Sequence, residues 1–158
     1  MPSQQTQEDL LELMYVLAKH MPASAEMVQA VTPFIMQSEV PALQKRGYKV
    51  LDAVLSNEHP HTQAFVAANI DFVLLQVTNS ALVVVPASSH HRLKCIYSLI
   101  KHLSAAQLLQ LVPGNFMVEV ILATKEVNDR ARAMAYHVLV AVGERIQQLE
   151  VCFFKYRN

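Results

Sequence analysis

A short phrase that recurs three times in this chain constrains its fold more than any other feature. A tyrosine is followed, two and three positions later, by two aliphatic residues at Tyr48 to Leu51, Tyr97 to Ile100 and Tyr136 to Leu139. Each copy lies inside a longer stretch with helical periodicity. The tyrosines are 49 and then 39 residues apart. We therefore expect similar helices to recur along the chain and to pack in a regular order.

The third copy indicates that the phrase marks a buried helix face. Arg132, His137 and Glu144 fall away from an apolar stripe of helical spacing. That stripe consists of Met134, Ala135, Val138, Leu139, Val142 and Ile146. Such a helix cannot bury its apolar face alone, and repeats of roughly 40–47 residues are typical of HEAT and armadillo helix pairs. The predicted fold is an all-α, HEAT/armadillo-type right-handed superhelical array of antiparallel helix pairs, which places function on a surface.

The predicted elements amount to roughly eight helices in a single domain, 1–158. Ser104 to Gln107 reads as a capping box. The segment 79–86 is either a short strand, on its β-branched content, or an ordered loop. Residues 59–61 are expected to form a linker. The expected helices are 7–20, 24–37, 41–56, 64–77, one that begins at Ser88 or Ser89 and ends at Leu103, 104–113, 115–126 and 128–148.

Composition restricts the function classes. The chain is 53% hydrophobic but only 16% charged, below the roughly 25% of typical soluble domains. We therefore expect neighbouring repeats of a longer array, or a partner, to cover part of its apolar surface. Thirteen basic and thirteen acidic residues give no net charge, which argues against a nucleic-acid binder held by phosphate contacts alone. Two distant cysteines predict no disulfide framework. The polar N-terminus and the absence of an 18-residue apolar run predict an intracellular protein without membrane contact.

Catalytic and metal chemistry have little support in the sequence. The histidine pairs His59 with His61 and His90 with His91 could hold a metal if their loops met, but loop and cap residues are the preferred interpretation. Cys95 could act as a nucleophile beside a histidine, yet its core phase favours a buried, inert thiol. No glycine-rich phosphate loop or nucleophile elbow is present. We predict no active site, no cofactor and no metal.

Basic residues near the starts of equivalent helices are the candidate partner-binding residues. Stacked repeats would align them as a ladder that could contact RNA phosphate or an acidic protein surface. The alternative is solvated helix ends that pair with Glu119, Glu126 and Asp129. The tyrosines of the repeated phrase could be base-stacking platforms, but packing between repeats with the hydroxyl at the edge fits their phase better. The ladder comprises Lys45, Arg46, Lys49, Arg92, Lys94, Lys101, Lys125, Arg130 and Arg132.

Several segments resemble a known family. Arg92 to Cys95, Leu103 to Ala105, Val118 to Val127 and Ala131 to Val140 are similar, in order and spacing, to consecutive HEAT repeats of ribosomal RNA-processing protein twelve. Gln44 to Leu51 resembles the preceding repeat, so the likeness covers about residues 40–148. Residues 149–158 do not resemble the corresponding part of the family. The basic C-terminal region of the family is absent from this sequence.

The resemblance implies a non-catalytic scaffold in ribosome biogenesis. Family members are long proteins of the nucleus and nucleolus that associate with small-subunit ribosome precursors and assist ribosomal RNA maturation and export through the nuclear pore. Pre-ribosomal proteins, precursor RNA and nuclear transport factors are therefore the expected partners. The sequence contains no cluster of lysine and arginine that would predict nuclear import, so location in the nucleus is implied by the resemblance alone. A generic HEAT or armadillo adaptor in transport or another assembly is the alternative, and a metal- or cysteine-dependent enzyme is a third class.

Overall fold

The computed structural model describes the backbone of residues 2–155 and the side chains of residues 2–148. Within this part of the chain the structure is all-α and contains no strand, which confirms the all-α part of the predicted fold. Two short 3₁₀ helices, η1 (Ser80–Leu82) and η2 (Pro86–Ser88), lie in the middle of the chain. The α-helices are α1 (Gln4–His20), α2 (Ala25–Ile35), α3 (Pro41–Ser56), α4 (Pro60–Ala68), α5 (Ile70–Asn79), α6 (Ser89–Ile100), α7 (Ala105–Leu111), α8 (Asn115–Ala123) and α9 (Asp129–Lys155).

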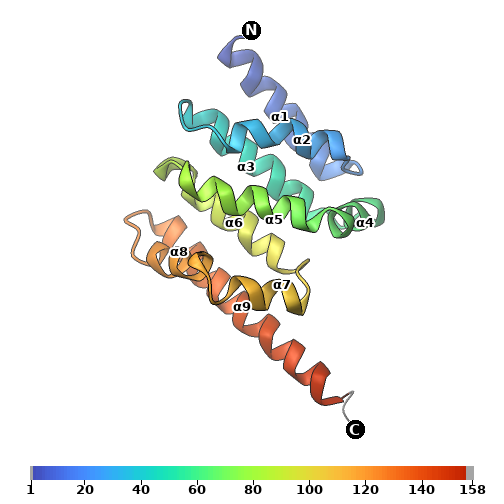
Figure 1. Cartoon of the computed structure of the whole chain (residues 1–158). Coiled ribbons are helices and arrows are strands. Elements are labelled where there is room, and N and C mark those ends of the chain that lie inside the picture. Colours follow the sequence, from blue (N-terminus) through green and yellow to red (C-terminus); the bar gives the residue numbers. More distant parts are fainter. Residues whose placement is uncertain (1, 156–158) are drawn as a thin grey trace.

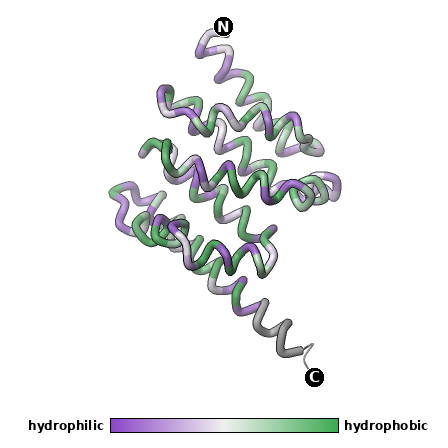
Figure 2. Tube along the Cα trace, in the orientation of Figure 1, coloured by the Kyte–Doolittle hydropathy of each residue, from purple (hydrophilic) through white to green (hydrophobic). Residues whose placement is uncertain are grey.

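The helices form two layers (Figure 1). One layer, here called the inner layer, contains α1, α3, α6 and α9, which run in the same direction and pack in that order. The outer layer contains α2, then α4 with α5, then α7 with α8. Along the helices of both layers hydrophobic and hydrophilic residues alternate (Figure 2), as amphipathic helices require.

The core runs through the middle of the stack. In α3 every residue from Val50 to Leu55 is buried, because α1 and α6 cover it on opposite sides and α2 covers a third. Tyr48 is fully buried, Tyr97 is half-buried and Tyr136 is 53% exposed. The hydroxyl of Tyr48 is itself buried, so the expectation of a hydroxyl at the edge was wrong at this position. Burial raises the pKa of Tyr48 to about 12.

Three of the four inner helices, α1, α3 and α6, are each closed at the C-terminal end by a side chain from the next inner helix or its flanking residues. A helix leaves its last carbonyl groups without internal partners, and here side chains from about forty residues later supply donors. Asn57 donates from Nδ2 to the carbonyl oxygen of Ala18 at 2.7 Å. His102 Nε2 lies 2.8 Å from the carbonyl oxygen of Leu55, and Arg145 donates to that of Leu103 at 3.2 Å. The same device therefore recurs at α1, α3 and α6.

Close approach of the layers depends on Gly47. A Cβ atom at this position would lie 3.1 Å from Cγ2 of Ile35 and 3.1 Å from Cβ of Phe34. Real Cβ contacts are seldom so short, so the absence of a side chain lets α2 lie against α3. Glycine usually destabilises a helix, but at position 47 it is required because a larger residue would clash with α2.

Several local predictions need correction. The predicted linker at 59–61 is wrong, because Pro60 opens α4 at a position where its missing N–H is not needed. The predicted helix over 64–77 is broken at Asn69, whose side-chain nitrogen donates back to the carbonyl oxygen of Phe65. The alternative of a strand at 79–86 is also wrong. There the buried amide of Gln44 donates to Val83 and accepts from the backbone of Val85, which holds a loop.

Other local predictions are confirmed. Ser104 and Gln107 form the reciprocal capping box. The side chain of Asn128 accepts from the backbone N–H of Arg130 and Ala131 at the start of α9. That helix continues to Lys155 and so beyond the predicted end at 148. The departing C-terminal segment from 149 lies outside the described side chains.

No single described helix is long and apolar enough to cross a membrane. By length and hydropathy alone, two adjacent pairs reach that level together, α4 with α5 and η1, and α7 with α8, and each pair is bent by 70°.

Candidate functional site

A cluster of cations occupies neighbouring positions of the inner layer. Lys45 and Lys49 lie on α3, and Lys94 lies on α6 next to His91. The pKa of His91 is lowered to about 4, chiefly by partial burial and then by the charges of His90 and these three lysines. The imidazole is therefore neutral at pH 7. The structure thus brings three of the predicted ladder residues around one point.

An aromatic ring connects this cluster to α1. The ammonium groups of Lys49 and Lys19 lie 4.7 Å and 5.3 Å from the ring centroid of Tyr15, within cation–π range. Lys94 pairs with Asp52 at 3.1 Å, and the charge of Asp52 raises the pKa of Lys94. A groove of about 230 Å³ beside them is lined by Tyr15, Lys19, Asp52, Ala53, Ser56, Asn57 and Lys94. We call Lys19, Lys45, Lys49 and Lys94, with Tyr15, the basic cluster.

A second cation–aromatic pair lies one helix further along the stack. The ammonium group of Lys101 is 5.2 Å from the ring centroid of Tyr97. Both residues line a groove of about 280 Å³ between α6 and α9, together with Glu144 and Arg145. Successive grooves of the inner layer therefore carry a lysine on a tyrosine, which extends the basic surface along the array.

Arg92 does not belong to this surface, and its inclusion in the ladder was wrong. Its side chain is 2% exposed, because this position of α6 faces inward. The guanidinium donates to the carboxylate of Glu119 and to the carbonyl oxygen of Val77, the latter at 2.9 Å, and from Nε to Oγ of Ser80 at 3.2 Å. Arg92 thus connects α5, α6 and α8 inside the protein. Glu119 was predicted as a pairing partner of the ladder residues, but at solvated helix ends and not at a buried arginine.

The other ladder residues serve separate regions. Arg46 contacts Glu12 at 2.7 Å and Glu8 at 3.3 Å on α1. Arg132 pairs with Asp129, as the helix-end interpretation predicted. Lys125 and Arg130 are exposed near the α8–α9 turn. The backbone carbonyl oxygen of Arg130 lies 3.1 Å from Nδ1 of His90.

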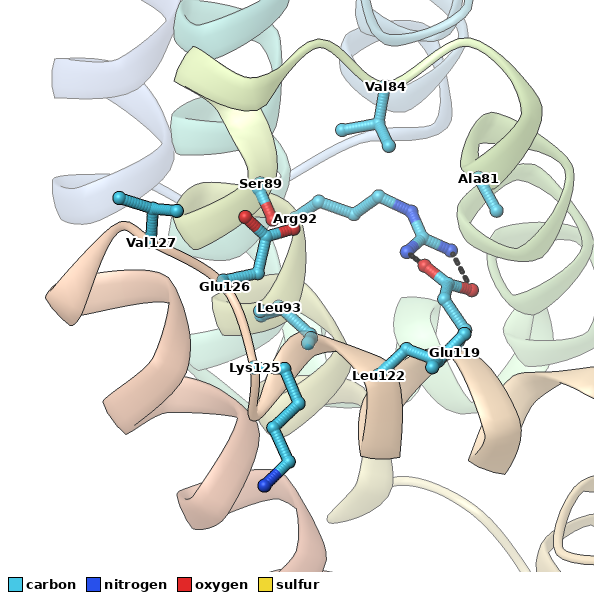
Figure 3. Close-up of a pocket in the computed structure, with 11 residues that line it drawn as sticks. Ala81, Val84, Ser89, Arg92, Leu93, Glu119, Leu122, Lys125, Glu126 and Val127 are labelled. Atoms are coloured by element: carbon cyan, nitrogen blue, oxygen red, sulfur yellow. Dashed lines mark hydrogen bonds and ion pairs between the residues drawn. The ribbon is translucent and has the colours of Figure 1, made fainter.

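A cleft of about 450 Å³ surrounds the ion pair of Arg92 and Glu119 (Figure 3). The carboxylate of Glu119 faces the guanidinium, while Glu126 and Lys125 come from the segment after α8. The cleft combines the segments Arg92 to Leu93 and Val118 to Val127, both among those that resemble the ribosomal RNA-processing family. Its walls are lined by Ala81, Val84, Ser89, Arg92, Leu93, Glu119, Leu122, Ala123, Lys125, Glu126 and Val127.

The candidate catalytic and metal residues have ordinary surroundings. Cys95 is buried, as predicted, and its thiol donates to the carbonyl oxygen of Tyr48 at 3.1 Å. Burial raises its pKa well above the ordinary value. The rings of His59 and His61 stack on each other at 5.4 Å. Among the described side chains no three of His, Cys, Asp and Glu are placed to hold a metal ion together.

The fold and these surfaces define a class of protein: a layered all-helical stack with shallow grooves along its helices. No family model matches the sequence, but three curated relatives do. The chain belongs to the RRP12 family. It is 35% identical to the RRP12-like protein of Gallus gallus over 111 residues, which cover 68% of this chain and 8% of that protein.

Two further relatives have matching names. The RRP12-like protein of Homo sapiens is 28% identical over 143 residues, 87% of this chain and 11% of the human protein. Ribosomal RNA-processing protein 12 of Schizosaccharomyces pombe is 28% identical over 104 residues, 66% of this chain and 9% of the relative. The chain therefore spans about a tenth of the length of the relatives it matches.

Proposed function

We propose that this chain is a non-catalytic scaffold of the HEAT/armadillo type that acts in ribosomal RNA processing by binding small-subunit pre-ribosomal particles. The observation that carries the proposal is the similarity to three proteins named for RRP12 or ribosomal RNA processing. The inner helices α1, α3 and α6, each closed by a donor from the next inner helix or its flanking residues, support the repeat architecture, a right-handed superhelical array of antiparallel helix pairs. Residence in the nucleus and nucleolus, and contact with nuclear transport factors, belong to the same proposal.

The basic cluster is the proposed contact with precursor RNA. The chain has no net charge, so affinity for phosphate depends on local concentration of cations. Lys19 and Lys49 provide this around Tyr15, and Lys45 and Lys94 provide it around His91. Lys101 continues it at the next groove. Each neutralised phosphate releases counterions. For single strands, each such contact contributes about −0.7 to the slope of the logarithm of the binding constant against the logarithm of the salt concentration, here called the salt slope. Binding through this surface is therefore weak at high salt.

Affinity purification tests the scaffold. The tagged chain, expressed in cells, is expected to recover small-subunit ribosome precursors, and ribonuclease treatment distinguishes RNA-dependent from protein-dependent recovery. Recovery of a consistent set of proteins unrelated to ribosomes would overturn the ribosomal proposal and favour a generic adaptor.

A charge-reversal pair tests the basic cluster directly. Lys45→Glu with Lys49→Glu is expected to weaken binding of an oligouridine RNA and to reduce the salt slope by roughly one to two. Lys125→Glu with Arg130→Glu changes the net charge equally but lies outside the cluster, so it is the matched control. Equal loss in both double variants would show that net charge alone, and not the basic cluster, determines binding.

The cleft around Arg92 and Glu119 favours a second candidate, a protein-segment adaptor. Its walls combine exposed aliphatic residues, Leu122 at 65% and Val127 at 94%, with charges of both signs. Such a surface suits a peptide better than a polyanion. Leu122→Asp is then expected to remove a protein partner whose recovery survives ribonuclease.

A further inference from the structure

A buried carboxylate lies beside the cations of the basic cluster. Asp52 of α3 is 8% exposed, and it lines the groove of about 230 Å³ formed by α1, α3 and α6. Its Oδ1 accepts a hydrogen bond from Oγ of Ser98 at 2.7 Å, and its Oδ2 pairs with the ammonium group of Lys94 at 3.1 Å. Because Ser98 is itself buried on α6, it holds the carboxylate in one orientation. A groove surrounded by lysines therefore contains one oriented negative group.

The carboxylate of Asp52 retains acceptor capacity. An ionised carboxylate offers about four lone-pair positions on its two oxygens, and Ser98 and Lys94 occupy one on each. The side chain of Asn57 in the same groove is already engaged, because it donates to the end of α1 and accepts from the backbone N–H of His59. The side chain of Lys94 is 51% exposed, and its ammonium group has further donors. The pair of Asp52 and Lys94 thus presents two acceptors and one donor side by side.

Guanine is the RNA base whose Watson–Crick edge matches this order of groups. Its 2-amino group and its N1–H are adjacent donors, and its O6 acceptor follows them. A carboxylate accepts from both donors, and an ammonium group next to the carboxylate donates to O6. Adenine and cytosine instead place a ring-nitrogen acceptor beside their amino group, where it would face a carboxylate oxygen. Uracil offers a single N–H between two carbonyl acceptors. The chemistry of the pair therefore favours guanine over the other three bases.

We propose that Asp52 and Lys94 recognise a guanine base of single-stranded RNA, the 2-amino group and N1–H donating to the carboxylate and O6 accepting from the ammonium group. This inference rests on the proposed contact of the basic cluster with precursor RNA and adds a base preference to it. The base must be unpaired, because only then is its Watson–Crick edge free. Lys19 and Lys49, which lie beside Tyr15, are placed to contact the flanking phosphates. At about 230 Å³ the groove is smaller than the roughly 300–1,000 Å³ of pockets for drug-sized ligands, which suits a single base.

The first test compares short oligouridine RNAs that differ only at one central base. Fluorescence anisotropy measures the affinity of the purified chain for RNAs with uracil, guanine, adenine, cytosine or hypoxanthine at that position. Guanine is expected to bind about tenfold more tightly than the other three natural bases, within the range of one two-point base contact. Hypoxanthine retains N1–H and O6 but lacks the 2-amino group, so its affinity is expected to be intermediate. Equal affinity for all five RNAs would overturn the guanine inference and leave the RNA contact in place, whereas no binding of any would overturn both.

Asp52→Asn tests the carboxylate itself. The amide keeps the size of the side chain and an oxygen that accepts from Ser98, but it loses the charge and one acceptor. The variant is expected to lose most of the preference for guanine, while its affinity for plain oligouridine stays the same or rises because a negative charge has gone. An unfolded variant would instead bind both RNAs more weakly. Ser98→Ala, which keeps the charge and releases the carboxylate, is the second variant and is also expected to reduce the preference.

Asp71→Asn is the matched control. It removes the same charge from a carboxylate of α5 in the outer layer, which accepts from Nε2 of Gln107 at 2.5 Å. This control is expected to retain the full preference for guanine. Full preference in Asp52→Asn, or an equal loss of preference in Asp71→Asn, contradicts recognition of the base by Asp52.

Discussion

The guanidinium of Arg92 and the carboxylate of Glu119 form a two-point ion pair at the inner wall of a cleft, with Nη2 and Oε2 3.2 Å apart. Arg92 is buried, whereas the Glu119 side chain is 33% exposed. The remaining donors of the guanidinium reach Val77 and Ser80. The sequence pattern suggests that Arg92 is a surface cation, but this arrangement gives it a structural role inside the protein.

Arg92→Ala is expected to destabilise the fold by about 3–5 kcal/mol, because removal of one partner of a buried pair leaves polar groups unsatisfied. Arg46→Ala is the matched control. Arg46 also pairs with two carboxylates, but its side chain is 33% exposed, so its loss is expected to cost at most about 1 kcal/mol. Urea unfolding of both variants measures the difference. Equal costs would refute the structural role of the Arg92 pair.

Asn57→Ala is expected to destabilise the chain by about 1–2 kcal/mol, since two carbonyl oxygens at the end of α1, those of Ala18 and Met21, lose their donor. The local consequence is faster amide hydrogen exchange in the last turn of α1, with less effect on α9. Hydrogen-exchange mass spectrometry resolves the two regions. Uniform acceleration across the chain would contradict a local capping role.

Stability is expected to fall as the pH falls from about 6.5 to about 4, in part because of His91. Its pKa is lowered to about 4 in the folded chain from about 6.5 in the unfolded chain. Between these values the unfolded state binds more protons, so acidification favours unfolding. His91→Gln is expected to flatten this part of the stability–pH curve measured by thermal unfolding. An unchanged slope in the variant would assign the dependence to other groups.

Gly47→Ala and Gly143→Ala are expected to have opposite effects, although both glycines lie within helices. Alanine usually stabilises a helix by about 1 kcal/mol relative to glycine. At Gly143 the added methyl group meets open space, so the variant is expected to gain this amount. At Gly47 it meets Ile35 and Phe34 at 3.1 Å, so the variant is expected to be less stable than the wild type. Melting temperatures compared side by side decide the question.

The sequence predicted the inner layer more accurately than the outer layer, for a physical reason. The helices around Tyr48, Tyr97 and Tyr136 have continuous apolar stripes, and their positions were anticipated. The break at Asn69 and the loop held by Gln44 depend on hydrogen bonds to backbone groups, partly of distant residues, that leave no periodic signal. The grouping of Lys45, Lys49 and Lys94 followed from stacked helices. Tyr15 and Lys19 were missed, because only the packing of α1 on α3 brings them to the same place.

The closing of each helix end by a later residue implies an order in which the inner helices are completed during synthesis. Asn57, His102 and Arg145 lie 39, 47 and 42 residues after the carbonyl groups that they complete. On the ribosome, where the chain is made from its N-terminus, each of these inner helices therefore emerges well before the side chain that finishes it. The C-terminal carbonyl groups of α1, α3 and α6 therefore gain these hydrogen bonds only after the next inner helix has been synthesised. During synthesis, the most recently completed of these helices still lacks them.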